Sequence, residues 1–267
     1  METIDSRNFL AGVRDAARPR PAGRPRGGKA WTPLFIVASP RPRSGKTFLA
    51  RLLIDFLHVD DGGARAFDLN PGESALAEQP MTLAVRADIA SIEGQMALFD
   101  RLIVEDGVAK VIDLGNTMFE RFFDLMDEID FVQEASRRAV EPVILYPAET
   151  HPASPHAYCR LRRRFPDLIV VPVLNEAILK GQRVRDAFPF VRAAAVPLQI
   201  PLLAPALKRY ADQPHYSFAD FHNKLPEEIP EGLAVELRSW TRRAFLELRE
   251  FELRLLLEKV RASLGAS

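Results

Sequence analysis

Cysteine is almost absent from this chain. Cys159 is the single cysteine among 267 residues, so no disulfide can form within the chain. A chain without disulfides suits a reducing compartment, and we expect a cytoplasmic location.

Long apolar runs are also lacking. No stretch approaches the ~20 consecutive apolar residues that a membrane-spanning helix needs, so we expect no membrane span. The chain begins Met-Glu-Thr-Ile-Asp, without the basic start and apolar run of a secretory signal. These features predict a soluble protein.

The chain has no excess of charge of either sign. Its 36 basic residues balance 36 acidic ones, so the whole molecule has no electrostatic preference for nucleic acid or acidic lipid. A local exception is the stretch RDAARPRPAGRPRGGK at residues 14–29. It has almost nothing to bury, and we expect residues 1–30 to form a flexible basic arm. Such an arm is either a solvated tail or a contact for DNA or an acidic partner.

From residue 31 onward, short apolar runs alternate with amphipathic stretches. Strands that alternate with helices predict an α/β protein with a doubly wound, mostly parallel sheet and helices on both faces, over residues 31–228. The predicted strands are residues 34–39, 64–69, 82–87, 108–115, 142–147, 167–174 and 194–200. The predicted helices are residues 47–57, 91–102, 117–129 (resuming to 138) and 158–165.

The pattern of the last part of the chain, residues 229–267, predicts a C-terminal helical extension of one or two long helices. One stripe of this helical pattern is apolar and consists of Leu237, Trp240, Ala244, Leu248, Phe251 and Leu255. We expect the stripe to pack against the sheet; the alternative is a dimer or partner contact.

A phosphate-binding motif follows the first predicted strand. The loop PRPRSGKT at residues 40–47 lies between LFIVAS and a helix, and it ends as the motif G-x-x-x-x-G-K-[ST] does. In such a loop, backbone N–H groups bind phosphates, the lysine reaches the β- and γ-phosphates, and the hydroxyl holds Mg²⁺. Pro40 and Pro42 have no N–H, so the donors must begin at Arg43. The expected cofactor-binding residues here are Arg43, Ser44, Gly45, Lys46, Thr47 and Phe48.

Two acids end later strands. Asp113 closes Val-Ile-Asp, a position from which a carboxylate can hold Mg²⁺ together with Thr47. Asp68 closes Ala-Phe-Asp in the same way. Either acid alone has another explanation, because strand-end acids also cap helices and bind backbone amides.

Three segments together resemble the ParA/MinD family of P-loop ATPases, relatives of the nitrogenase iron protein and dethiobiotin synthetase. R-P-R-S-G-K-T at 41–47 corresponds to the family loop K-G-G-x-G-K-T, D-L-N-P at 68–71 to D-x-D-P, and V-I-D at 111–113 to the strand that ends in the second acid. The resemblance covers residues 33–210.

The resemblance implies a role for several residues. Lys46 and Thr47 would bind phosphate and Mg²⁺. Arg41 stands where the family has a lysine that reaches across a nucleotide-bridged dimer, and Asn175 matches an asparagine that recognises adenine. Arg41 can also be a solvated loop arginine, and Asn175 can be a helix N-cap.

Departures from the family affect catalysis. The second acid of D-x-D-P, which positions the attacking water, is Asn70 in this chain. An amide can hold a water but cannot accept its proton. With Lys46, Asp68 and Asn70 as the catalytic candidates, we expect at most a weak or partner-stimulated ATPase.

The resulting functional hypothesis is an ATP-binding switch. ATP with Mg²⁺ would favour a homodimer, the dimer would recruit DNA or a protein through the basic arm or the C-terminal helices, and hydrolysis would release the partner. The alternatives are an ATP-dependent ligase or kinase on the same fold, and a scaffold that binds nucleotide without hydrolysing it.

His151, His156 and Cys159 lie close together in the sequence HPASPHAYC. A structural zinc site needs four ligands, and no second cluster supplies the fourth. The resemblance implies that this loop follows a core strand near the nucleotide, so we expect loop packing or a nucleotide contact from these residues.

Overall fold

The computed structural model describes residues 31–61, 63–71, 76, 84–190, 192–213, 216–223 and 229–265. The expected basic arm, residues 1–30, lies outside these ranges, as do residues 82–83 of the third predicted strand.

The centre of the molecule is a seven-stranded sheet in the order β3-β2-β4-β1-β5-β6-β7. Every neighbouring pair of these strands is parallel. The predicted fold class, a doubly wound parallel sheet with a C-terminal helical extension, is confirmed. The strands are β1 (Thr32–Val37), β2 (Ala64–Leu69), β3 (Val85–Arg86), β4 (Ala109–Leu114), β5 (Val140–Pro147), β6 (Ile169–Asn175) and β7 (Leu198–Ile200).

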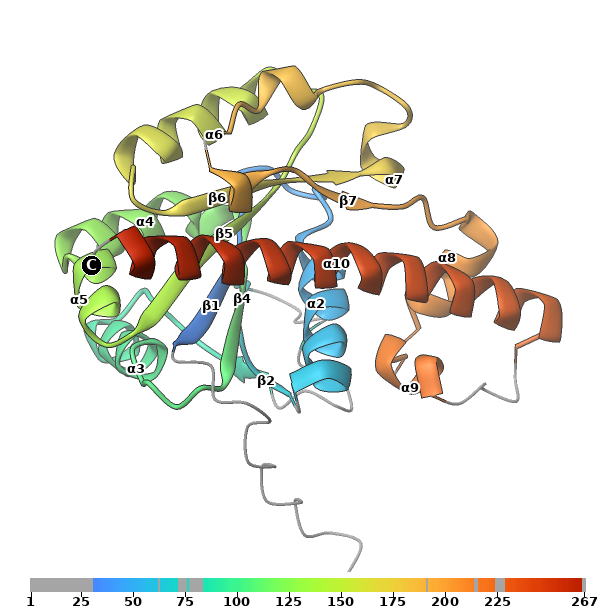
Figure 1. The fold of residues 1–267 in the computed structure, drawn as a ribbon, viewed down its shortest axis with the longest axis horizontal. Coiled ribbons are helices and arrows are strands. Elements are labelled where there is room, and N and C mark those ends of the chain that lie inside the picture. Colours follow the sequence, from blue (N-terminus) through green and yellow to red (C-terminus); the bar gives the residue numbers. More distant parts are fainter. Residues whose placement is uncertain are drawn as a thin grey trace, which may run out of the picture.

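Helices cover both faces of the sheet (Figure 1). On one face, α2 (Lys46–Asp61), α8 (Pro205–Ala211), α9 (Phe218–Asn223) and α10 (Glu231–Gly265) share one apolar core with the strands. On the other face, the second core contains α3 (Ile92–Leu102), α4 (Phe119–Glu128), α5 (Phe131–Arg137) and α6 (Ala153–Arg164). The short helix α7 (Glu176–Leu179) follows β6 directly.

Some boundaries differ from the predicted ones for local reasons. β7 begins at Leu198, not at residue 194, because Pro197 has no N–H for the ladder and a 3₁₀ turn, Ala193–Ala195, precedes it. α6 begins at Ala153, five residues before the predicted start, since Pro155 is tolerated in a first helical turn. Asp130, with a φ of 49°, separates α4 from α5.

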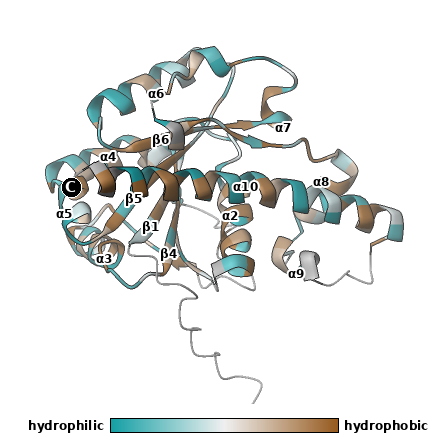
Figure 2. Cartoon of the chain, in the orientation of Figure 1, coloured by the Kyte–Doolittle hydropathy of each residue, from teal (hydrophilic) through white to brown (hydrophobic). Residues whose placement is uncertain are grey.

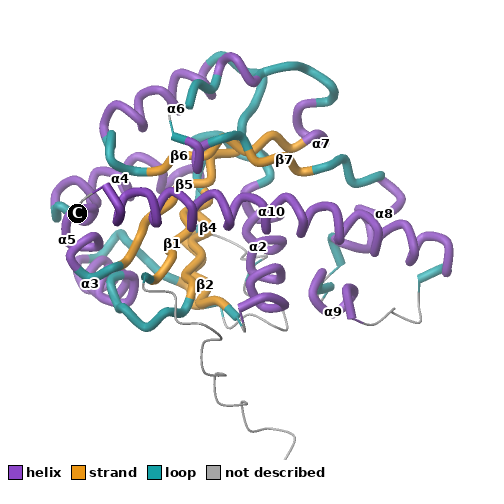
Figure 3. The backbone as a smooth tube through the Cα atoms, viewed as in Figure 1, coloured by secondary structure: helices purple, strands orange, loops and turns teal. Residues whose placement is uncertain are grey.

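The C-terminal extension is one continuous helix, α10, of 35 residues (Figure 3). All six residues of the apolar stripe predicted from the sequence are buried in the core that α10 shares with the sheet. The packing interpretation of that stripe is therefore the correct one. In the part of the chain that the structure describes, no helix has both the length and the apolarity to cross a membrane.

A buried polar group ties α9 to α2. Asp55 of α2 is fully buried and accepts hydrogen bonds from the backbone N–H of Phe218 (2.6 Å) and the hydroxyl of Ser217 (3.3 Å). One turn earlier, Arg51 donates to the carbonyl of Tyr216 (3.1 Å). Burial raises the pKa of Asp55 to about 6, against the opposing effect of these two hydrogen bonds and of Arg51.

The raised pKa of Asp55 predicts a pH dependence of stability. The folded chain holds this proton more tightly than the unfolded chain, whose carboxyl titrates near 3.8. The contribution of Asp55 to the free energy of unfolding is therefore largest below pH 4 and is lost as the pH rises through about 6. Asp55→Asn keeps an acceptor for Phe218 but cannot titrate, so it should destabilise the protein less at pH 7.5 than at pH 4.5.

Urea unfolding of both proteins at the two pH values measures this difference. Asp55→Ala is the matched comparison: it cannot titrate either, but it leaves the buried N–H without a partner, so it should be less stable than Asp55→Asn by about 1–3 kcal/mol at both pH values. An Asn variant with the same free-energy loss at both pH values would contradict the prediction.

Candidate functional site

The phosphate-loop motif lies between β1 and α2, at the edge of the sheet where the parallel strands have their carboxyl ends. β1 has β4 on one side and β5 on the other. The strands β2 to β4 extend the sheet on one side of β1 and the later strands β5 to β7 extend it on the other, so the strand order changes direction at β1. Open α/β sheets bind ligands at such a switch point. A cavity of about 390 Å³ opens here, lined by Pro42, Arg43, Ser44, Gly45, Lys46, Thr47, Phe48, Asn70, Asn116, Asn175, Ala177, Ile178, Pro201, Leu203 and Lys208.

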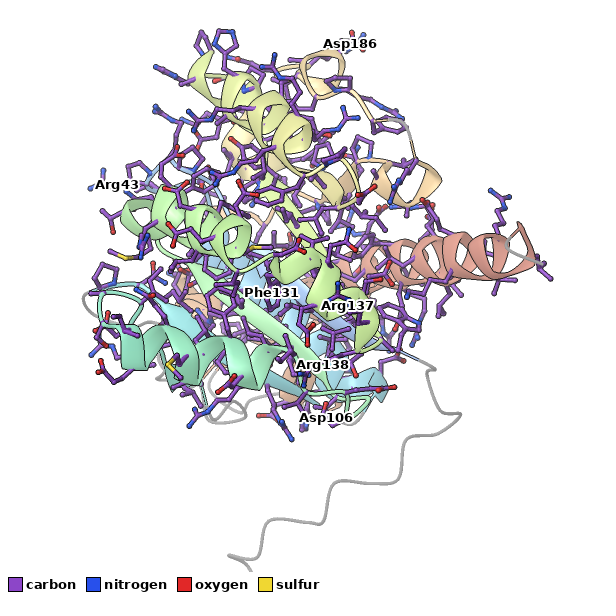
Figure 4. The ribbon with its side chains drawn as sticks, turned by 90° about the vertical axis from the view of Figure 1, so that its left-hand side faces the viewer. Arg43, Asp106, Phe131, Arg137, Arg138 and Asp186 are labelled. Atoms are coloured by element: carbon purple, nitrogen blue, oxygen red, sulfur yellow. The ribbon has the colours of Figure 1, made fainter. Side chains whose placement is uncertain are left out.

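The loop backbone has an unusual conformation at two positions. Arg43 has a φ of 58° and Gly45 a φ of 84°, whereas Ser44 between them keeps a negative φ. Alternating backbone hands of this kind turn successive N–H groups towards one side and form an anion-binding concavity. For Arg43, a non-glycine residue, the left-handed conformation costs about 1–2 kcal/mol. Its side chain projects from the surface of the molecule (Figure 4).

Lys46 closes the loop from within. Its side chain is only 7% exposed, and Nζ donates to the carbonyl of Arg41 (2.8 Å) and the hydroxyl of Ser44 (3.3 Å). Burial lowers the pKa of Lys46, while the carboxylates of Asp113 and Glu149 oppose this shift. The ammonium group thus lies inside the curve of the loop, next to the concavity formed by the N–H groups.

Thr47 and Asp113 meet beneath the loop. The Thr47 hydroxyl donates to Oδ2 of Asp113 at 2.7 Å, which joins the start of α2 to the end of β4. Asp113 is fully buried, and burial raises its pKa to about 6. Its other oxygen, Oδ1, is buried and has no hydrogen-bond partner among the described residues.

Asn70 connects the two strand-end acids. Its Nδ2 donates to Oδ1 of Asp68 (2.8 Å) and to Oδ2 of Asp113 (3.0 Å), and its backbone N–H also donates to Asp68 (2.9 Å). Asn70 lines the cavity, whereas Asp68 is buried behind it. The amide therefore neutralises part of the repulsion between two neighbouring carboxylates.

These residues fit a magnesium ion. Mg²⁺ prefers oxygen ligands and usually binds one or two protein groups together with waters and substrate phosphates. The unpaired Oδ1 of Asp113 and the hydroxyl of Thr47 provide such oxygens. The described residues contain no group of three or more His, Cys, Asp or Glu side chains that could hold a metal alone.

The side chain of Arg41 lies outside the cavity wall. Its Nε donates to Oε2 of Glu149, just after β5, at 2.6 Å, and the side chain is 36% exposed. The structure thus pairs Arg41 with an acid of its own chain, a contact that the sequence did not predict.

Asn175 combines both roles considered for it. It caps α7, because its Oδ1 accepts the N–H of Ala177 at 3.0 Å. The same side chain lines the cavity, with Nδ2 3.5 Å from the position that a Cβ on Gly45 would occupy. The cap fixes the orientation of the amide that faces the loop.

Part of the cavity wall consists of residues that the sequence did not predict. Asn116 follows β4, Ile178 lies in α7 after β6, and Pro201 and Leu203 follow β7. The available signal was their position just beyond the carboxyl ends of predicted strands. His156 and Cys159 belong to α6, and His151, just before it, accepts the N–H of Ala153 through Nδ1.

Comparison with known proteins adds no assignment: no family model matches the sequence, and no curated protein matches it. The geometry of the site is therefore the evidence for what it binds.

Proposed function

We propose that this cavity binds ATP with Mg²⁺ and that the chain acts as a nucleotide-dependent switch in the cytoplasm. The observation that carries the proposal is the pair formed by Thr47 and Asp113, with an unpaired carboxylate oxygen beneath a loop in which Arg43 and Gly45 are left-handed, at the start of α2. A helix N-terminus, converging N–H groups and a lysine together suit a triphosphate.

Each part of the site suits one part of the nucleotide. The N–H groups from Arg43 onward and the ammonium of Lys46 would bind the phosphates. Lys46 would exchange its present partners, the Arg41 carbonyl and the Ser44 hydroxyl, for phosphate oxygens. Asn175 and the apolar Leu203 line the part of the cavity that would take the base.

Thr47 and Asp113 would hold the magnesium ion. The ion supplies charge compensation for the triphosphate. Asp113 must be ionised for this, and its burial next to Asp68 works against ionisation until a cation is bound.

Hydrolysis is expected to be slow, because Asn70 uses its Nδ2 to bridge two carboxylates and has no basic group to accept a proton from water. The same observation favours a second candidate, a scaffold that binds nucleotide without turnover. The two differ only in whether bound ATP is consumed.

The switch itself would depend on Arg41. In the present structure this side chain is held by Glu149 of the same chain. We propose that in the ATP state it reaches instead towards the phosphates of a second copy. Contacts made in one state alone shift the equilibrium towards that state, and the ATP-bound homodimer would then recruit DNA or a protein.

Replacing Lys46 tests nucleotide binding. Lys46→Ala should weaken Mg-ATP binding at least tenfold, since a hydrogen bond to a charged group contributes about 1.5–3 kcal/mol. Isothermal titration calorimetry measures the affinity, and urea unfolding shows whether the variant remains folded. Lys180→Ala, at an exposed lysine outside the loop, is the matched control and should bind as the parent does. A folded Lys46→Ala protein with parental affinity would refute the phosphate-site assignment.

Replacing each member of the Arg41–Glu149 pair tests the switch. Arg41→Ala should leave the affinity for ATP nearly unchanged but weaken ATP-driven dimers, because losing one partner of a buried charge pair costs about 2–5 kcal/mol. Glu149→Gln releases Arg41 and should strengthen those dimers. Light scattering measures the increase in mass from ADP to ATP, and an equal increase in all three proteins would reduce Arg41 to a surface residue.

Replacing Asn70 distinguishes the switch from the scaffold. Asn70→Asp introduces a carboxylate beside Asp68 and Asp113, whose charges raise its pKa and make it a better proton acceptor. A general base typically contributes ~10²–10⁴-fold, so we expect hydrolysis near the detection limit in the parent and at least ~10-fold faster in the variant. Phosphate release measures the rate. Asn70→Ala, which cannot accept a proton, is the control; if it accelerates hydrolysis equally, proton acceptance is not the cause.

A further inference from the structure

α10 carries a second row of residues on the side opposite the buried stripe. The outer stripe consists of Val235, Ser239, Arg242, Leu246, Glu250, Leu253, Leu257, Val260 and Leu264, all of them exposed. They follow one another at intervals of three or four residues, which places them on one side of a helix. Its six valines and leucines are 51–73% exposed.

The outer stripe lies on an accessible part of the molecule. α10 crosses the sheet as the element nearest the viewer in Figure 1. Apolar residues recur along its whole length in Figure 2. Packing in the core accounts for the buried stripe only, so the exposed apolar residues of the outer stripe need another explanation.

We propose that the outer stripe pairs with the outer stripe of a second copy of this chain, with the two α10 helices antiparallel and a two-fold axis at Leu246. In such a pair, residues equally far from the axis in opposite directions face each other. Leu246 then faces its own copy, and Arg242 faces the partner's Glu250, four residues away on the other side. A two-fold axis makes this charge pair twice.

The two charges specify the orientation. In a parallel, in-register pair Arg242 would lie beside the partner's Arg242 and Glu250 beside the partner's Glu250, which is repulsive. In the antiparallel pair each meets the opposite charge. Arg242 has no ion-pair partner within the described part of the chain, and Glu250, whose side chain is 67% exposed, is paired with Arg254 of the same helix at 2.9 Å. Glu250 has free acceptor capacity for a second cation.

The remaining positions match in the same register. Val235 faces Leu257 and Ser239 faces Leu253, so apolar surface meets apolar or small residues on both sides of the axis. Gly232 faces Val260, and a Cβ on Gly232 would meet nothing within 4 Å, so the space for the valine is open. The matched segment from Val235 to Leu257 is ~33 Å long at 1.5 Å per residue.

The buried stripe prepares α10 for this role. Because Trp240, Leu248 and Phe251 fix the helix on the sheet, its outer face is ordered before association. Little conformational entropy is then lost when two copies meet. The outer stripe is also separate from the residues that line the nucleotide cavity, so this pairing does not depend on nucleotide.

Sedimentation of the full chain without nucleotide tests the proposal. The parent should show a concentration-dependent dimer, and Leu246→Lys, which puts two like charges at the axis, should be monomeric. Met96→Lys on α3 removes a similarly exposed apolar side chain (61%) elsewhere and should leave the dimer intact. A parent that stays monomeric at every concentration, or a Leu246→Lys protein of unchanged mass, would overturn the proposal.

A charge exchange tests the antiparallel register. Arg242→Glu and Glu250→Arg each place like charges opposite one another and should raise the dimer dissociation constant at least ~10-fold. The double variant restores opposite charges and should recover most of the parental affinity. Additive weakening in the double variant would exclude this register. Since all measurements omit ATP, failure here leaves the nucleotide-binding proposal intact, and loss of ATP binding in Lys46→Ala leaves this one intact.

Discussion

A parallel sheet whose strands are apolar on both faces must be covered on both sides, and the rest of this molecule follows from that requirement. β1 and β4 are buried at every position, so α2 and α10 must lie on one face and α3 to α6 on the other. Helices that connect parallel strands also bring all the strand carboxyl ends to one edge. The residues at the ends of these strands therefore meet at that edge: the phosphate loop, Asn70, Asp113 and Asn175.

The features that sequence predicts well are local. A continuous apolar run identifies a strand, and residues that end such runs share one edge, so Lys46, Thr47, Asp68 and Asp113 can be grouped from the order of residues alone. The buried stripe of α10 is also identified from the sequence, since apolar residues at a period of 3.6 over many turns indicate an amphipathic helix. Loop conformation is less clear, because the two prolines and Arg43 replace the glycines that usually identify it.

The features that sequence could not predict depend on pairs of distant residues. Glu149 lies 108 positions from Arg41, and the sequence of neither segment indicates that the two residues form an ion pair. The bridging role of Asn70 needs the distance between two acids, which the order of β2 and β4 in the sheet determines. The sequence pattern does not identify the outer stripe of α10, because apolar residues on both sides of a helix weaken the 3.6-residue period. Only the exposure of the side chains in the structure distinguishes the two sides of the helix.

The packing of Trp240 also gives the protein a built-in optical reporter. Its ring lies 6.0 Å from that of Phe48, and its Nε1 donates to the carbonyl of Pro201 at 3.1 Å; both residues line the cavity. The chain's other tryptophan, Trp31, lies under the ammonium of Lys259 at the start of β1, at the opposite edge of the sheet. The emission of Trp240 should therefore respond to any molecule that moves the cavity walls, whereas Trp31 contributes a constant background that a phenylalanine in its place would remove.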